Sequence, residues 1–348
     1  MSEKIENLLG EDRTFDPPSS IVENANATQE WFDLANEDRL AYWQKQALER
    51  ITWYKEPKEI LDDSDAPFYK WFKDEEINLA YNCLDRHLET DGDRIAFYWE
   101  GEPGDSQEIT YQDLYERVCK LSNGLKELGV KKGDRIAIYL GMTPEIVISM
   151  LACARIGAVH SVVFGGFSAE ALADRINDAE AKVVITADGA WRRGDIVPLK
   201  QNVDDSLKLT DHIESVIVVK RTENEVTMVD GRDYWYSELV DKQEADCEPE
   251  VMNAEDMLYI LYTSGTTAKQ KGIVHTQAGY LTGVTTTHSA VFDVKEDDIY
   301  WCAADCGWVT GHSYIVYGPL ANKTTSVMYE GAPNAPDEKR LWSIVEKY

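Results

Sequence analysis

The most informative stretch of this chain reads Tyr262-Thr-Ser-Gly-Thr-Thr-Ala-Lys-Gln-Lys-Gly-Ile-Val-His275, and it follows directly on the apolar run Met257-Leu-Tyr-Ile-Leu-Tyr262. A strand that runs into a loop rich in hydroxyls and cations is typical of phosphate binding, because backbone N–H groups and hydroxyls can both donate to anionic oxygens. Lys269 or Lys271 can neutralise developing charge. The alternative interpretation is a polar surface turn.

Two other nucleotide motifs do not fit the sequence. A P-loop requires G-x-x-x-x-G-K-[ST], but counting from Gly265 places Gln270 at the second glycine. The dinucleotide motif G-x-G-x-x-G is not found either, since Gly165-Gly166 is followed by Phe167. Neither a P-loop NTPase nor a Rossmann dehydrogenase is therefore favoured.

Outward from this stretch, short apolar runs alternate with amphipathic segments. We predict a helix after the N-cap Thr110 that ends at Gly129, and another that Pro144 opens. Alternation of strands and helices with short connections predicts parallel sheets flanked by helices in an α/β fold. The predicted strands span residues 94–99, 135–140, 159–164, 183–186, 217–219, 257–262, 300–303 and 325–328, and further helices span 144–156 and 169–178.

The N-terminal part differs in composition from the rest. Residues 1–26 are polar, acidic and interrupted by Pro17-Pro18, which predicts a disordered acidic tail. Residues 27–85 carry scattered aromatic residues in a rough helical pattern and are predicted to form an N-terminal helical cap. Residues 86–348 are assigned to the α/β domain.

The charge balance limits the possible partners. The chain has 63 acidic and 35 basic residues, a formal net charge of −28, which argues against nucleic acids and anionic membranes. A halophilic source with a salt-rich cytoplasm would screen this charge, and an ordinary acidic cytosolic enzyme is the alternative. No signal peptide, membrane span or disulfide framework is predicted, and Cys302 and Cys306 lack a partner pair at zinc spacing. We expect a cytoplasmic protein without a metal site in this chain.

Several ordered blocks resemble one family. Tyr262–Gly272 is similar to the signature of the adenylate-forming, AMP-dependent acyl-CoA synthetases (the AMP-binding superfamily), and the stretch from Tyr300 to Leu320 resembles the acetyl-CoA synthetases among them. Further similar blocks are Val163–Ser168, Ile185–Asp188 with Pro198–Lys200, and Tyr329–Asn334. The resemblance implies the large-domain fold of adenylate-forming enzymes, preceded by the cap.

The resemblance also implies a reaction. Acetate would attack ATP to give acetyl-adenylate and pyrophosphate, and coenzyme A would then release AMP and form acetyl-CoA. The implied cofactors and substrates are acetate, ATP, coenzyme A and Mg²⁺. Two alternatives stay open: a catalytically inactive remnant that binds coenzyme A or a partner, and a ligase for propionate or another short-chain acid.

The phosphate-loop residues implied by the resemblance are Thr263, Ser264, Gly265, Thr266 and Thr267, with Lys271 as the catalytic residue. The sequence departs from the family pattern at two positions, with Ala268 where glycine is usual and Gln270 where proline is usual. An alanine costs free energy if the backbone needs a positive φ, and losing proline leaves the loop less constrained. Both changes put ATP handling in doubt.

The same resemblance implies an acyl pocket and a coenzyme site. The acyl pocket would comprise Trp308, Val309 and Thr310, and the coenzyme A site Phe164, Gly165, Gly166, Arg192, Arg193, Gly194, Thr310 and Asn334. Arginine suits phosphate because its planar guanidinium donates two hydrogen bonds. Asp195 departs from the family, where a basic residue often stands. His275 and His312 are interpreted as structural or positioning residues, because acetate needs no general base.

In the family, roughly half of the protein follows the helix predicted near residue 337. That half holds the adenine and ribose contacts, the magnesium carboxylates and a mobile lobe with a catalytic lysine. We therefore expect the chain to be inactive alone and to leave a sheet edge and an apolar face uncovered. A complementary C-terminal chain is the partner that this expectation implies.

Overall fold

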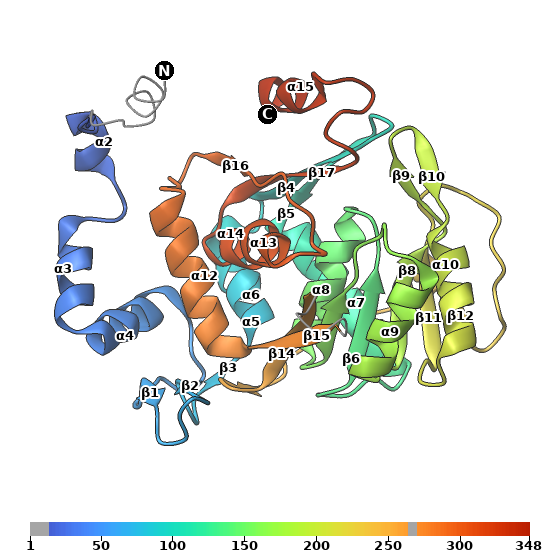
Figure 1. Ribbon diagram of the computed structural model, residues 1–348, viewed down its shortest axis with the longest axis horizontal. Coiled ribbons are helices and arrows are strands. Elements are labelled where there is room, and N and C mark those ends of the chain that lie inside the picture. Colours follow the sequence, from blue (N-terminus) through green and yellow to red (C-terminus); the bar gives the residue numbers. More distant parts are fainter. Residues whose placement is uncertain (1–13, 264–269) are drawn as a thin grey trace, which may run out of the picture.

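The computed structural model describes residues 14–263 and 270–348 (Figure 1). Within these residues the larger sheet has seven strands, parallel except for the antiparallel edge strand β15. In spatial order they are β12 (Asp233–Trp235), β11 (Ser215–Val219), β8 (Val183–Ala187), β6 (Arg135–Tyr139), β7 (Val159–Val162), β14 (Met257–Thr263) and β15 (Lys271–Thr276).

A second, smaller sheet packs beside it. In the described part of the chain it has four strands, β16 (Ile299–Trp301), β17 (Thr325–Glu330), β4 (Ile95–Gly101) and β5 (Ser106–Thr110). The first three are parallel and β5 is antiparallel. Short antiparallel pairs join β1 (Leu61–Asp62) to β2 (Lys70–Trp71), β3 (Glu76–Ile77) to β13 (Met252–Asn253), and β9 (Ala190–Arg192) to β10 (Asp195–Val197).

Helices flank both sheets, which confirms the α/β prediction. Thr110 caps α7 in a reciprocal pair with Asp113, and Pro144 opens α8, as predicted. The helices of the α/β part are α5 (Leu79–Cys83), α6 (Asp85–Asp91), α7 (Tyr111–Glu127), α8 (Pro144–Arg155), α9 (Ala169–Ala179), α10 (Leu199–Ser206), α11 (Tyr236–Val240), α12 (Gln277–Val291), α13 (Val309–Gly311), α14 (Gly318–Ala321) and α15 (Arg340–Lys347). A 3₁₀ turn spans Leu207–Leu209 and a π-helical segment spans His312–Tyr317.

Three helices, α2 (Ser19–Asn24), α3 (Gln29–Glu37) and α4 (Arg39–Arg50), precede the sheets and run along one side of the molecule next to α12 (Figure 1). Helix α2 lies inside the stretch expected as a tail, residues 1–26. Asn26 fastens this region, because its side-chain amide donates to the carbonyls of Ser289 and Val294 and its backbone N–H donates to Asp293. Residues 1–13 of the predicted tail lie outside the described residues.

Two differences from the sequence prediction matter for the site. The predicted strand over 159–164 ends at Val162, so Val163 and Phe164 leave the sheet. The second half of the signature stretch is itself a strand, β15, paired with β14 so that Thr263 faces Lys271. Local sequence did not show this pairing, since Lys271-Gly-Ile-Val-His-Thr276 has no clear alternation.

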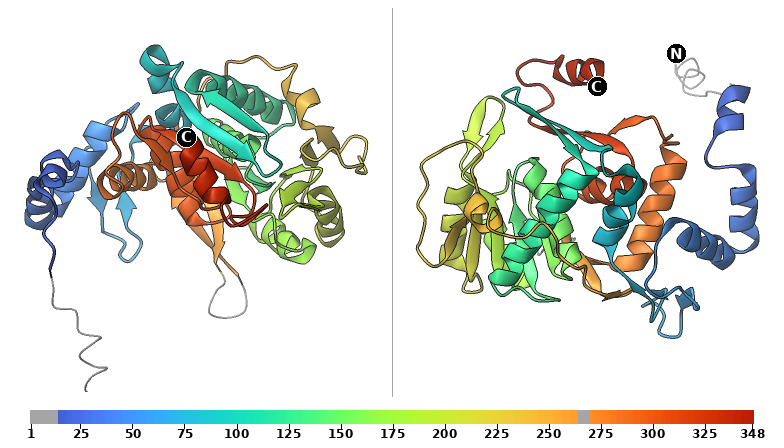
Figure 2. Two further views of the ribbon diagram at one scale, coloured as in Figure 1. Left: turned by 90° about the horizontal axis from the view of Figure 1, so that it is seen from above. Right: turned by 180° about the vertical axis from the view of Figure 1, so that it is seen from behind.

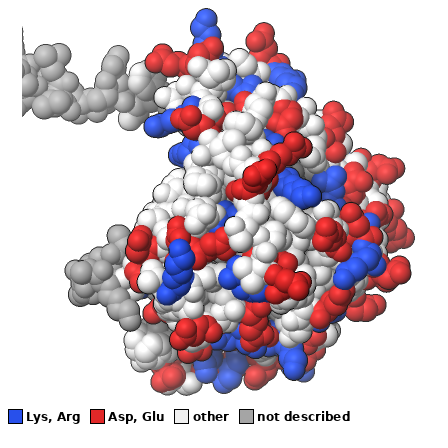
Figure 3. Space-filling view, turned by 90° about the vertical axis from the view of Figure 1, so that its right-hand side faces the viewer, with Lys and Arg blue, Asp and Glu red and all other residues white. Residues whose placement is uncertain are grey.

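Most acidic side chains lie on the exterior, and the interior is largely apolar apart from a few buried charged residues. Figure 3 shows Asp and Glu side chains spread over one whole face, with Lys and Arg between them. Among the exposed apolar side chains are Ile273 and Val274 on edge strand β15, and Trp342 and Val345 on α15. Helix α15 lies beside β4 (Figure 2), where the ring of Tyr348 stacks on Tyr98 at 4.9 Å. None of the described helices is long and apolar enough to cross a bilayer.

Candidate functional site

A cavity of about 390 Å³ opens between the two sheets. It lies where β7 ends and where β16 and β17 of the smaller sheet pass. Ligands in α/β proteins bind outside the carboxyl ends of parallel strands, so this position is the expected one. Four residues predicted for the coenzyme and acyl sites line it together, namely Phe164, Arg192, Trp308 and Thr310.

Phe164 is the centre of this cluster. Its ring meets the indole of Trp308 edge-on at 4.7 Å between centroids, and the Arg192 guanidinium lies 5.3 Å from the ring centroid. Such contacts add a modest attraction beyond burial. A Cβ at Gly166 would come within 2.5 Å of the Phe164 ring, so only glycine allows the chain to fold back over this side chain.

The Tyr139 hydroxyl holds the loop that carries Phe164. The Tyr139 hydroxyl lies 2.7 Å from the Phe167 carbonyl and 3.1 Å from the Gly165 carbonyl, and donates to one of them. The amide of Asn202 donates to the same hydroxyl at 3.1 Å. The position of the cavity wall therefore depends on α10, which carries Asn202.

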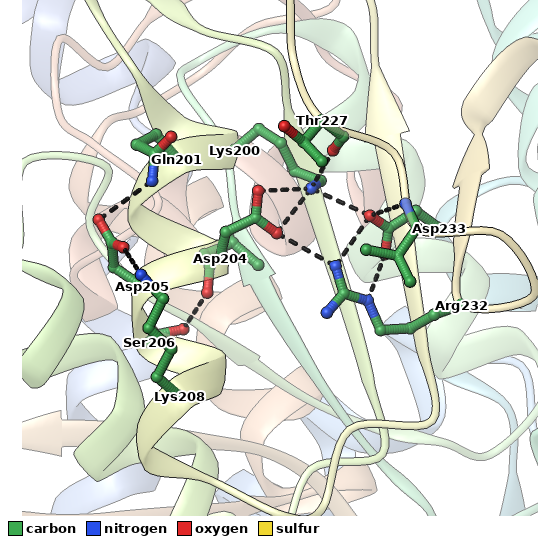
Figure 4. Close-up of polar contacts among 11 residues, drawn as sticks. Lys200, Gln201, Asp204, Asp205, Ser206, Lys208, Thr227, Arg232 and Asp233 are labelled. Carbon is green, nitrogen blue, oxygen red and sulfur yellow. Dashed lines mark hydrogen bonds and ion pairs between the residues drawn. The ribbon is translucent and has the colours of Figure 1, made fainter.

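A buried ionic network fixes α10 in turn (Figure 4). Lys200, whose side chain is fully buried, donates to Asp204 at 2.7 Å and to the Thr227 carbonyl at 2.7 Å, and pairs with Asp233 at 3.0 Å. Arg232 pairs with Asp233 and Asp204 from the other side. Buried charges are costly unless paired, so this network ties α10 to the edge strand β12.

The predicted phosphate arginines lie on the hairpin of β9 and β10. Arg193 (φ +57°) and Gly194 (φ +78°) both adopt left-handed backbone conformations at its tip. They line a second cavity of about 500 Å³ together with Asn334. Asp195 is the register partner of Arg192 across the hairpin. Six of the predicted coenzyme residues are therefore divided between two cavities that meet at this hairpin, whereas Gly165 and Gly166 are among the described lining residues of neither cavity.

Two carboxylates brace the hairpin. Asp188 directly follows β8, and its Oδ1 accepts from the backbone N–H groups of Gly189, Arg221 and Thr222 at 2.8–3.0 Å. The Arg221 side chain donates to Glu330 at the end of β17, at 2.6 and 2.8 Å. This chain of contacts joins the larger sheet to the smaller sheet. Burial raises the pKa of Glu330, against the Arg221 guanidinium that lowers it.

A third carboxylate, Glu102, lies between the hairpin and the loop that follows β17. It accepts from the backbone N–H of Gly194 at 2.7 Å and of Ala332 at 2.7 Å. Burial opposes ionisation, but these backbone donors and that of Arg193 hold the pKa of Glu102 below its ordinary value. The carboxylate is therefore an anion held between two segments of the candidate site.

The predicted acyl pocket is only partly assembled. Trp308 is 49% exposed and lines the cavity with Thr310, whereas Val309 is not among the described lining residues. Asp305 lines the same cavity, and burial raises the pKa of its carboxyl, against the Gly307 N–H and Arg192. Apolar side chains of Met142 and Ile315 complete the inner wall.

The predicted phosphate loop stands at a different place, between β14 and β15. Thr263 and Lys271 are exposed register partners at its base, and neither is among the described residues that line the two cavities. The Tyr262 hydroxyl donates to Asp178 at 2.9 Å, which fixes the base of the hairpin to α9. Ser264, Gly265, Thr266 and Thr267, like Ala268 and Lys269, lie outside the described residues.

The two histidines interpreted as positioning residues meet in one aromatic cluster. His312 is fully buried, lies 4.4 Å from the ring of Tyr259 and stacks on His160 at 5.5 Å. His275 stacks on the other side of Tyr259 at 4.7 Å. Burial lowers the pKa of His312 to about 4, so the imidazole is neutral at pH 7. This placement is typical of packing rather than of proton transfer.

Within residues 14–263 and 270–348, no group of three or more His, Cys, Asp or Glu side chains is arranged to hold a metal ion. The six cysteines are free, and five of them are buried. Burial raises the pKa of Cys302, which lines the first cavity, so its thiol is protonated at neutral pH.

Comparison with known families decides the classification. A family model described as AMP-binding enzyme matches residues 84–348. The chain belongs to the AMP-binding enzyme family. A second model, described as acetyl-coenzyme A synthetase N-terminus, matches residues 18–83.

Individual relatives in this family carry one name. An acetyl-coenzyme A synthetase of Streptomyces avermitilis is 58% identical over 349 residues, covering 100% of this chain and 53% of the relative. The synthetase of Pasteurella multocida is 53% identical, covering 98% of this chain and 53% of the relative. The synthetase of Mycolicibacterium smegmatis is 54% identical, covering 96% of this chain and 36% of the relative. The chain thus spans about half the length of the curated relatives it matches.

The site is also held in place by residues that the sequence analysis did not identify. Glu102, Tyr139 and Arg221 are separated from the residues they hold by 26 to 230 positions along the chain. Only Asp188 carried a local signal, because a carboxylate directly after a buried strand end is placed at the ligand edge of a parallel sheet.

Proposed function

We propose that this chain forms the coenzyme- and acyl-binding part of an AMP-forming acetate–CoA ligase. The observation that carries the proposal is the convergence of Phe164, Arg192, Trp308 and Thr310 on one cavity between the sheets. The names of the relatives, at 53–58% identity, support the same reaction. Adenylation makes the acyl carbon electrophilic, and the protein contributes positioning and charge stabilisation.

In this proposal coenzyme A lies along the hairpin of β9 and β10. Its thiol end reaches the first cavity, where Trp308 and Thr310 lie, and its nucleotide end lies at the second cavity near Arg193, Gly194 and Asn334. Phe164, which lines the first cavity beside Trp308, would contact the coenzyme between these two ends. The exposed guanidinium groups of Arg192 and Arg193 suit phosphate oxygens.

Acetate is the proposed acyl substrate. An indole and a short hydroxyl residue leave room for a methyl group better than for a longer chain, so Trp308 and Thr310 favour a small acid. Discrimination of one methylene in an apolar pocket is worth about 1–3 kcal/mol, which limits the preference over propionate.

ATP would bind at the hairpin of β14 and β15, with Lys271 neutralising charge on the phosphates. Mg²⁺ would supply further charge neutralisation at the phosphates, and no group of three or more candidate ligands for it is found in residues 14–263 and 270–348. Because the chain spans about half the length of its relatives, we propose that further groups come from residues outside this sequence, on the same or a complementary chain.

Acetate-dependent ATP–pyrophosphate exchange tests the ligase proposal, measured in high salt on the purified chain and on the chain mixed with the C-terminal half of the Streptomyces avermitilis relative. We expect exchange at least in the mixture, and its loss in Lys271→Ala. No exchange in either sample, from folded protein, would contradict the ligase proposal. Saturable coenzyme A binding without exchange would instead favour a binding protein that lacks ligase activity.

A further inference from the structure

The carboxylate of Glu102 accepts a hydrogen bond at the tip of the β9–β10 hairpin, next to the two arginines proposed to bind coenzyme phosphate. We propose that Glu102 is a specificity-determining residue that competes with the 3′-phosphate of coenzyme A for the tip of the β9–β10 hairpin. The site would then bind coenzyme A little better than its 3′-dephospho form. This inference rests on the proposed function, since it assigns the second cavity to the nucleotide end of the coenzyme.

The geometry of the tip is that of an anion site. Arg193 and Gly194 have consecutive positive φ values, as the two-residue turn of a β-hairpin requires, and the backbone N–H groups of both residues donate to one carboxylate. Here that anion is Glu102, at 2.7 Å from the Gly194 nitrogen. The second oxygen accepts from Ala332, on the opposite wall of the cavity, also at 2.7 Å.

The position of the tip fits one end of the coenzyme. The thiol has to reach the acyl group near Trp308 in the first cavity, so the nucleotide end must lie towards the second cavity. Arg193 and Gly194 are exposed, and a ligand phosphate can therefore reach the same N–H that Glu102 holds. The two anions cannot share one donor at close range without repulsion.

The charges near the tip favour this interpretation. Arg192 and Arg193 attract phosphate, but Glu102 and Asp195 bring two negative charges to the same hairpin. Glu102 itself stands in the tight turn between β4 and β5, where the Gly104 N–H donates to the Gly101 carbonyl at 3.0 Å. A side chain in such a turn can leave the Gly194 amide without disturbing a helix or a strand.

A purely structural role for Glu102 predicts the opposite result. If the carboxylate only connects the hairpin to Ala332, removing its charge should weaken the binding of every ligand of the cavity equally. If it competes with phosphate, removing its charge should strengthen binding, and only of the ligand that carries the 3′-phosphate. The sign of the change therefore separates the two roles.

The test is isothermal titration of coenzyme A and of 3′-dephospho-coenzyme A into the chain and into Glu102→Gln. The glutamine keeps one acceptor oxygen for the brace and removes the charge. Glu102→Ala is a second variant with the same expected direction, and circular dichroism checks folding. Glu108→Gln is the matched control, because Glu108 is an exposed glutamate on β5, in the β4–β5 hairpin that also carries Glu102.

We expect Glu102→Gln to lower the Kd of coenzyme A about tenfold, with the Kd of the dephospho form and the control unchanged. An unchanged or higher Kd for coenzyme A in both Glu102 variants, with the parent chain binding normally, would overturn this inference alone. If the folded parent chain binds neither ligand, the proposed coenzyme site fails and this inference fails with it.

Discussion

The two halves of the candidate site are built in different ways. The coenzyme side is held by buried polar contacts between distant segments: Tyr139 under the Phe164 loop, and Arg221 between the two sheets. The phosphate side is a hairpin at the edge of the larger sheet, whose Thr263 and Lys271 are exposed. One side is fixed by tertiary structure and the other extends from a single strand pair.

The side of the site that is easiest to recognise in the sequence is therefore not the side that the structure holds most firmly. The phosphate hairpin carries the most recognisable sequence in the chain. Its strands are held through Tyr259 and Tyr262, but Thr263 and Lys271, next to the predicted phosphate loop, are exposed. The coenzyme side carries weaker sequence signals, but it is fixed by buried contacts whose loss would lower the free energy of unfolding. We therefore expect substitutions on the coenzyme side to change stability and binding, and those on the phosphate side to change chemistry alone.

The largest effect should come from the ionic network beneath the coenzyme side. Lys200→Met removes the buried cation that links Asp204, Asp233 and the Thr227 carbonyl, and leaves Arg232 alone to compensate two carboxylates. We expect the free energy of unfolding in urea to fall by about 3–5 kcal/mol.

Lys208→Met is the matched control, because Lys208 also pairs with an aspartate on the same segment but its side chain is 72% exposed. We expect it to leave the urea midpoint close to the parent value. Equal losses in the two variants would show that burial of the network does not stabilise this part of the fold.

The next effect should appear on the phosphate side without any loss of stability. Lys271→Ala removes the cation proposed to neutralise the phosphates, and we expect acetate-dependent pyrophosphate exchange to fall about a hundredfold. The urea midpoint and the Kd of coenzyme A should not change. Lys70→Ala, on the exposed strand β2, serves as the control. A change in coenzyme A affinity in Lys271→Ala would mean that the two sides are not separate.

A third effect concerns pH. The folded-state pKa of His312 is about 4, below the ordinary 6.5, so the unfolded chain binds more protons between these values. The free energy of unfolding should therefore fall as the pH drops from 7 to 5, and His312 should account for on the order of 2 kcal/mol of that fall. His312→Gln should flatten the profile by this amount, whereas His212→Gln, at an exposed position, should not. An equally steep profile in His312→Gln would show that His312 is not held neutral.

The smallest effect should be on the loop itself. Tyr139→Phe removes the hydroxyl that holds the Gly165 and Phe167 carbonyls, and we expect a loss of about 1 kcal/mol in coenzyme A binding, or roughly fivefold in Kd. Tyr234→Phe, which removes a similar bond to the Gly231 carbonyl, is the control. If titration shows no difference between the two variants, Tyr139 does not position the loop.

Much of the fold could be predicted from the sequence, because its strands and helices carry local signals such as the Thr110 cap and Pro144. The convergence of Phe164, Arg192 and Trp308 rested on the family resemblance, and the cavity now places them together. The braces could not be predicted, because a glutamate in a turn such as Glu102 looks like any solvated residue until the Gly194 amide is brought beside it. The roles of the site residues remain predictions.

Hydrogen exchange with and without coenzyme A tests the central claim most directly, namely that the coenzyme side of the site is complete within this chain. We predict slower exchange in peptides that cover residues 162–168, 190–195 and 330–336 when coenzyme A is added. Peptides from β15, residues 271–276, should exchange at the same rate. Protection of β15 in place of those three segments, or no protection at saturating coenzyme A in a folded chain, would contradict the account.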